Sequence, residues 1–130
     1  MRETTMKTVL IIEDNPMNME LATDLLEMAG FRVLSSETAT AGMRLAKEEL
    51  PDIILMDIAL PDMDGLTATR RIKEDPNLRP IPIVALTAHA MSGDEAKALE
   101  AGCDGYITKP IDTRMFAKRI EEILVRDLRT

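Results

Sequence analysis

Four short apolar runs in this sequence each end in residues whose side chains suit phosphoryl chemistry. The residues that follow the runs are, in chain order, Glu13-Asp14, Asp57, Thr87 and Lys109. If the runs are neighbouring parallel strands, three carboxylates, a hydroxyl and an ammonium meet at one edge of a sheet. Such a set can hold a divalent cation and accept a phosphoryl group on an aspartate.

The three carboxylates set the chemistry that we expect at this edge. Glu13, Asp14 and Asp57 would repel one another and raise one another's pKa, and Mg²⁺ relieves this because it binds carboxylates, water and phosphate oxygens. An ionised aspartate attacks phosphorus without a general base, so catalysis depends on positioning and charge neutralisation. Lys109 and the metal ion would supply the neutralising charge, and the Thr87 hydroxyl would donate a hydrogen bond.

The rest of the sequence predicts the elements that position these residues. Strand-like and helix-like patterns alternate five times, with strands expected at 9–12, 31–35, 52–56, 81–86 and 103–108. This alternation predicts an α/β (βα)₅ fold, a doubly wound five-stranded parallel sheet with right-handed crossovers. In such sheets a ligand lies at the carboxyl ends of the strands, where the candidate residues fall.

Local signals mark the ends of the expected helices. Asn15-Pro16 predicts the start of the first helix and Gly30 its end, with Met17, Leu21, Leu25 and Met28 at helical spacing between them. The second helix is expected from Thr38 to Leu50 and the third from Asp64 to Asp75-Pro76. Ser92 with Glu95 forms a capping box, Gly102 ends that helix, and Asp112 caps a last helix with Met115, Phe116, Ile120, Ile123 and Leu124 inside.

Composition restricts the class of protein. The 130 residues fit one domain, expected to span 1–130 with a core at about 7–126 and no output domain. A net charge of −7 disfavours binding to nucleic acid or to an anionic membrane. The sequence has no membrane span and no signal peptide, so a cytoplasmic protein is expected, and the single cysteine, Cys103, fits a reducing compartment as a buried residue.

The motifs resemble one known family. Val9 to Asn15, Ile54 to Asp57 with Leu60 to Gly65, Ala85 to Ala88, and Gly105 to Pro110 are similar to the landmarks of response-regulator receiver domains of the CheY-like superfamily. The resemblance covers the chain from end to end and implies a flavodoxin-like sheet with strand order 2-1-3-4-5. Two segments, Glu13 to Pro16 and Thr87 to Gly93, are similar to DivK-type cell-cycle regulators.

The resemblance also implies roles for single residues. Asp57 would be the phosphoacceptor, and Asp14 and Asp57 would bind Mg²⁺ with the backbone carbonyl of Ala59, while Glu13 would act through bound water. Lys109 would bind the phosphate, aimed by its peptide bond to Pro110, which is often cis in such domains. Thr87 and Tyr106 would be the switch residues.

The implied partners follow from the same resemblance. A histidine kinase or histidine phosphotransferase would donate the phosphoryl group, docking near the first helix. Phosphorylation would shift the face formed by helix 4, strand 5 and helix 5, which binds a downstream protein target. The protein would thus be a signalling switch in a two-component or phosphorelay system, not an enzyme acting on a separate substrate.

Other functions fit these residues less well. A phosphatase of the haloacid dehalogenase type needs a second aspartate two residues after its nucleophile, where this chain has Pro16 or Ala59. An EF-hand loop around Gly65 would place Leu60 and Arg71 at ligand positions, which excludes calcium binding of that kind. A protein-binding module that keeps the fold but works without phosphorylation stays open.

Overall fold

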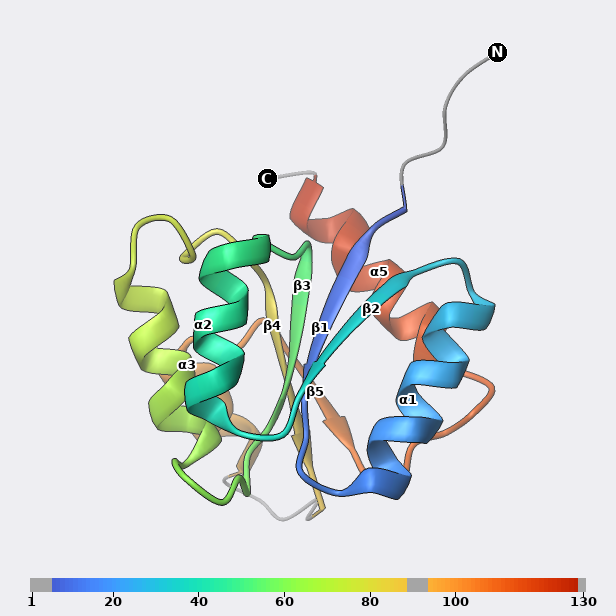
Figure 1. The fold of residues 1–130 in the computed structure, drawn as a ribbon, viewed down its shortest axis with the longest axis horizontal. Coiled ribbons are helices and arrows are strands. Elements are labelled where there is room, and N and C mark those ends of the chain that lie inside the picture. The colour runs from blue at the N-terminus through green and yellow to red at the C-terminus, as the bar shows by residue number, and fades with distance from the viewer. Residues whose placement is uncertain (1–5, 89–93, 129–130) are drawn as a thin grey trace.

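A five-stranded parallel sheet forms the centre of the computed structural model, which describes residues 6–88 and 94–128 (Figure 1). The strands are β1 (Thr8–Ile12), β2 (Arg32–Ser36), β3 (Ile53–Asp57), β4 (Ile83–Thr87) and β5 (Gly105–Thr108). Their order is β2-β1-β3-β4-β5, and all four pairings are parallel. The predicted fold class and strand order are therefore confirmed.

Five helices cover the two faces of this sheet. They are α1 (Pro16–Met28), α2 (Ala39–Glu49), α3 (Gly65–Glu74), α4 (Asp94–Ala101) and α5 (Phe116–Leu128). Helices α1 and α5 lie on one face, and α2 and α3 lie on the other (Figure 1), where α4 packs beside α3. Within the described residues, no helix combines the length and apolar content that crossing a bilayer requires.

The sheet separates two hydrophobic cores. Alternate residues of one strand point to opposite faces, so that Leu10 and Ile12 pack toward α2 and α3 while Val9 and Ile11 pack toward α1 and α5. Strands β3 and β4 are buried along their whole length. This is the pattern expected of parallel strands covered on both faces, and it explains their continuous apolar sequence.

Most of the predicted helix ends are confirmed. Asn15 caps α1 by accepting a hydrogen bond from the Asn18 backbone N–H at 3.0 Å, and Gly30 follows the helix with a φ of 96°. Thr38 caps α2 and Asp64 caps α3. The predicted capping box at Ser92 lies outside the described residues.

Several details of the sequence prediction were wrong. Strand β4 begins two residues later than expected, and β5 begins at Gly105, so that Cys103 is buried as predicted but precedes the strand. In α1, Met17 and Met28 are 79% and 85% exposed, because the inward stripe runs through Ala22 and Leu26. Met115 likewise lies outside the core, one residue before α5 begins. The helical spacing of large apolar residues selected Met17 and Met28, whereas the fold buries Ala22 and Leu26 on the inner face of α1.

Candidate functional site at the carboxyl edge of the sheet

The predicted site residues converge at the carboxyl ends of β1, β3, β4 and β5. They line one cleft of about 690 Å³, together with residues from the loops that follow these strands. The predicted residues that line the cleft are Glu13, Asp14, Asp57, Ala59, Thr87 and Lys109. Tyr106, the remaining one, lies on β5 opposite Ala85 of β4 and packs partly against the core beneath α3 and α4.

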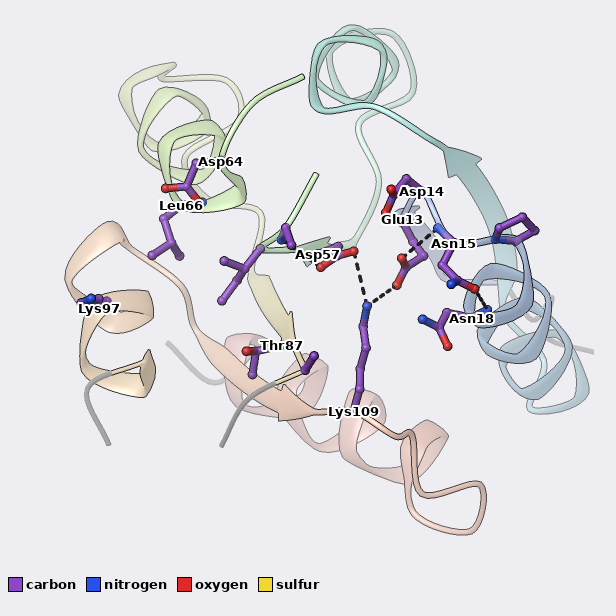
Figure 2. A pocket seen from close by; sticks show the side chains of 14 residues that line it. Glu13, Asp14, Asn15, Asn18, Asp57, Asp64, Leu66, Thr87, Lys97 and Lys109 are labelled. Carbon is purple, nitrogen blue, oxygen red and sulfur yellow. Dashed lines mark hydrogen bonds and ion pairs between the residues drawn. The ribbon is translucent and has the colours of Figure 1, made fainter. Parts of the chain in front are cut away.

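Lys109 joins the two buried carboxylates of the cleft (Figure 2). Its Nζ lies 2.8 Å from Glu13 Oε1 and 3.3 Å from Asp57 Oδ2. Among the described residues this ion pair alone satisfies Glu13 Oε1, which accepts no other hydrogen bond. The Glu13 and Asp57 side chains are 2% and 6% exposed, so the ammonium compensates charge where little water reaches.

Backbone groups hold these side chains in place. The Ala59 N–H donates to Asp57 Oδ1 at 3.0 Å, and the Asn15 N–H donates to Glu13 Oε2 at 3.1 Å. The Lys109 N–H donates to the Thr87 carbonyl at 2.6 Å, and the Lys109–Pro110 peptide bond is cis, as expected. The strand ends therefore fix both the carboxylates and the base of the lysine chain.

The pKa shifts of Asp57 and Lys109 reflect burial and the charged groups around each side chain. Burial raises the pKa of the Asp57 carboxyl and the neighbouring Glu13 raises it further, while the Ala59 N–H and Lys109 act in the opposite direction. Burial alone would lower the pKa of Lys109, but the hydrogen bond to Glu13 and the charges of Asp57 and Glu13 outweigh it and raise the pKa. A further cation would stabilise the ionised form of the buried Asp57 carboxyl.

The carboxylates are close enough to share such a cation. One oxygen from each of Glu13, Asp14 and Asp57 can be chosen so that all three lie within 4.8 Å of one another. Asp14 is exposed and the other two are buried, so the set opens toward water on one side. A hard cation such as Mg²⁺ takes one or two carboxylates and keeps several waters, which fits this arrangement.

Glycine at position 65 allows the loop after β3 to close against the strand. A Cβ added there would lie 2.3 Å from the Asp57 carbonyl oxygen and 2.8 Å from the Ile58 Cα. The Gly65 N–H donates to the Ile58 carbonyl at 2.8 Å. The start of α3 thus rests directly on the backbone of the predicted phosphoacceptor.

Comparison with known proteins places this architecture in a family. The sequence profile of the response regulator receiver domain matches residues 9–121. The chain belongs to this family. Receiver domains serve two-component signalling and bind Mg²⁺ at an acidic site, and this receiver has the Glu13, Asp14 and Asp57 cluster in the corresponding cleft.

Individual relatives support the same assignment. The receiver is 44% identical over 118 residues to the polar-differentiation response regulator DivK of Brucella ovis, which covers 91% of this chain and 96% of the relative. A CheY-like receiver domain protein of Methanospirillum hungatei is 27% identical with a TM-score of 0.88, covering 96% of this chain and 98% of that one.

A third relative has a metal ion in its site. The receiver domain of a sensor histidine kinase from Pseudomonas aeruginosa is 36% identical with a TM-score of 0.83, covering 97% of this chain and 100% of that one. Its structure has a magnesium ion coordinated in the active-site cleft. The family match and the 44% identity to DivK confirm the resemblance to DivK-type receivers that the sequence indicated.

Some residues of the cleft were not anticipated from the sequence. Asn18 and Lys97 line it from α1 and α4, and Asp64 and Leu66 line it from the start of α3. Lys97 and Asn18 follow no apolar run, so nothing in the strand pattern marked them. Asp64 was predicted as a helix cap. It also lines the cleft, because Gly65 brings the start of α3 close to β3.

Proposed function

We propose that this receiver is a phosphoacceptor switch in which Asp57 takes a phosphoryl group from a phosphohistidine. The donor would be a histidine kinase or a histidine phosphotransferase. The observation that carries the proposal is the placement of Asp57, a buried carboxylate at the cleft with the Lys109 ammonium 3.3 Å from its Oδ2. A nucleophile beside a fixed cation, in a cleft open to a ligand, is the arrangement that phosphoryl transfer needs.

The transfer step uses one oxygen of Asp57. Its electron pair forms a bond to phosphorus while the bond from phosphorus to the histidine nitrogen breaks, and the nitrogen keeps that electron pair. The product is an acyl phosphate on Asp57 and a free imidazole on the donor. Lys109 would neutralise part of the added negative charge, and the Thr87 hydroxyl would donate a hydrogen bond to a phosphoryl oxygen.

The acidic residues of the cleft fit a resident Mg²⁺. Glu13, Asp14, Asp57 and the Ala59 carbonyl would hold it, Glu13 through bound water. The three carboxylates can approach within 4.8 Å of one another, and Lys109 pairs with two of them. When bound, the ion neutralises phosphoryl oxygens as negative charge develops on them. Without it, Asp57 and the incoming phosphoryl group would repel each other.

The output of the switch would be a changed protein-binding face. Thr87 ends β4, and Tyr106 lies on the adjacent β5 opposite Ala85, two residues before Thr87. A phosphoryl group at Asp57 that draws in Thr87 would leave space for Tyr106 to rotate. This would bias the α4-β5-α5 face toward a conformation that binds a downstream target. The protein would work in the cytoplasm, and its likeness to DivK favours a role in polar differentiation.

Intact-mass analysis tests the acceptor directly. The protein is incubated with Mg²⁺ and acetyl phosphate, beside Asp57→Asn and an EDTA-treated sample. Asp24→Asn is the matched control, because Asp24 is an exposed aspartate on α1 outside the cleft. We expect the mass of one phosphoryl group on the wild-type and Asp24→Asn proteins, and no gain for Asp57→Asn or with EDTA.

A negative result would favour the alternative function. If acetyl phosphate and a phosphorylated histidine kinase both leave Asp57 unmodified, the chain is better described as a protein-binding module that works without phosphorylation. Labelling of Asp57→Asn to the same level as wild type would contradict the assignment of the acceptor while leaving the family assignment untouched.

A further inference from the structure

A second groove lies on the surface between α2 and α3, away from the phosphoacceptor cleft. The two helices lie side by side on one face of the sheet (Figure 1). The groove has a volume of about 590 Å³ and shares no lining residue with the cleft around Asp57. Met43 is the half-buried apolar residue of its lining, while Ile72 and Leu78 at its floor belong to the core and are each 1% exposed.

Basic side chains border this groove on both sides. Arg44 and Lys47 contribute from α2, one turn apart, and Arg71 contributes from α3. In the described part of the chain no carboxylate forms an ion pair with any of the three side chains. The acidic lining residues, Glu74 and Asp75, both lie at the carboxyl end of α3, and Asp75 accepts a hydrogen bond from the Asn77 N–H.

This basic border contrasts with the charge of the whole molecule. The chain carries a net charge of −7, and α1 on the opposite face contains three acidic residues and no basic one. A net negative protein repels acidic partners unless a local surface offers the opposite sign. Arginine and lysine side chains whose aliphatic stems lie beside Met43 provide such a surface.

We propose that the α2–α3 groove is a docking surface for an acidic amphipathic segment of a partner protein. The apolar residues of the segment would contact Met43 and the aliphatic stems of the basic side chains. Its carboxylates would pair with Arg44, Lys47 and Arg71. An amphipathic helix suits a groove between two helices, because its apolar stripe enters the groove while its flanks stay in water. Charge complementarity selects an acidic segment over a basic or a neutral one.

Hydrogen bonds connect the groove to the loop that follows Asp57 and β3. Asp62, in the loop after β3, accepts hydrogen bonds from the Ala39 N–H at 2.8 Å, the Thr40 N–H at 2.9 Å and the Thr40 hydroxyl at 2.7 Å. Thr40 itself lines the groove. A partner held here would therefore bind next to an anchor of that loop without covering the cleft or the α4-β5-α5 face.

Fluorescence anisotropy with a designed peptide tests the proposal. The probe is a fluorescein-labelled peptide of roughly 14 residues, about four helical turns, with leucines at helical spacing and glutamates on both flanks. A second peptide has glutamine in place of every glutamate. We expect saturable binding of the acidic peptide to the full chain, weakened by added NaCl, and much weaker binding of the glutamine peptide.

Paired charge reversals locate the binding. Arg44→Glu with Lys47→Glu should lower the affinity for the acidic peptide by about tenfold or more. Arg70→Glu with Lys118→Glu is the matched control, since both residues are exposed, lie outside the groove and change the net charge equally. The control should stay within about twofold of wild type, because diffuse electrostatics are screened by salt, and all proteins should melt cooperatively by circular dichroism.

Other outcomes would overturn the proposal. An equal loss of peptide affinity in both double variants would mean that only net charge matters. Failure of the acidic peptide to bind would show that the groove is not a docking surface for such a segment. Tight binding of a labelled single-stranded DNA in place of the peptide would make the occupant a nucleic acid. Self-association of wild type in sedimentation velocity, lost in Arg44→Glu with Lys47→Glu, would make it a second copy of the chain.

Discussion

At the scale of single residues, one lysine balances the charge of the cleft. Lys109 is the cation that the described residues place between Glu13 and Asp57, and its side chain is 14% exposed. A lysine chain is long and flexible, so its tip can move from one carboxylate toward an incoming phosphoryl group without a change in the backbone. The ion pairs observed here therefore describe a resting arrangement from which that movement would begin.

Replacing this lysine should make the protein depend on a metal ion. Lys109→Met leaves two buried carboxylates facing each other, and removal of one partner from a buried pair typically costs roughly 3 kcal/mol. We expect the free energy of unfolding to fall by about that amount in EDTA, with a large part restored by Mg²⁺. Urea unfolding followed by circular dichroism measures both, with Lys118→Met as the exposed control. Equal loss with and without Mg²⁺ would contradict a shared metal site.

Much of the site could be predicted from residue order. Asp57 and Lys109 each follow an apolar run directly, and parallel strands bring such positions to one edge of the sheet. What order could not show is that Lys109 reaches Glu13 at 2.8 Å as well as Asp57, because that depends on the conformation of a long side chain. Nor could it show Lys97 at the cleft, since its position depends on the packing of α4.

At the scale of elements, the loop after β3 organises two helices. Asp62 caps the start of α2 from 22 and 23 residues away, while Asp64 caps α3, the helix that follows it in the chain. The local cap was predicted from sequence, as was the end of α1 at Gly30. The distant cap was not, because no spacing rule connects a loop aspartate to a helix that precedes it. The loop that carries Ala59 is thus held at both helices.

The long-range cap should make α2 sensitive to acid. Hydrogen bonds from the Thr40 hydroxyl, the Thr40 N–H and the Ala39 N–H lower the pKa of Asp62 from 3.8 to about 2. Because the folded pKa is the lower one, Asp62 stabilises the fold at pH values above 3.8, and this contribution is lost as the pH falls through 3.8 toward about 2. Asp62→Ala should therefore be less stable than wild type at pH 7, with the gap closing in acid.

Urea titrations across this pH range provide the measurement. Wild type, Asp62→Ala and the exposed α1 control Glu20→Ala are compared at neutral pH and at successively lower pH values. A gap between wild type and Asp62→Ala that stays constant down to the lowest pH at which both fold would show that the carboxylate is not what stabilises α2.

The contact between α3 and β3 gives a second prediction at this scale. Gly65→Ala would drive a Cβ into the Asp57 carbonyl oxygen, and forcing an extra methyl group into a packed site typically costs about 1–3 kcal/mol. We expect lower stability together with displaced amide resonances at Ile58 and Ala59. Gly30→Ala is the control, because Gly30 has a φ of 96° but open space around it. That variant should lose stability through backbone strain and leave the Ile58 and Ala59 resonances unchanged.

At the scale of the whole molecule, the distribution of charge links stability to cations. The chain has 23 acidic and 16 basic residues, and three of its carboxylates converge on one cleft. Monovalent salt would relieve the general repulsion by screening it, whereas a divalent ion in the cleft would act at one place. The two effects can be separated because only the second requires the carboxylates of the cleft.

Magnesium should therefore raise the melting temperature beyond what salt does. A ligand that binds only the folded state at ten times its dissociation constant adds about 1.4 kcal/mol, which corresponds to roughly 5 °C for a domain of this size. Melting followed by circular dichroism in MgCl₂ is compared with NaCl at equal ionic strength. Asp14→Asn and Asp57→Asn should reduce the specific increase, while Asp52→Asn, at the opposite end of β3, should keep it. Equal increases in both salts would mean that Mg²⁺ acts on this molecule by screening alone, and the cluster of Glu13, Asp14 and Asp57 would then be a solvated edge of the sheet instead of a metal site.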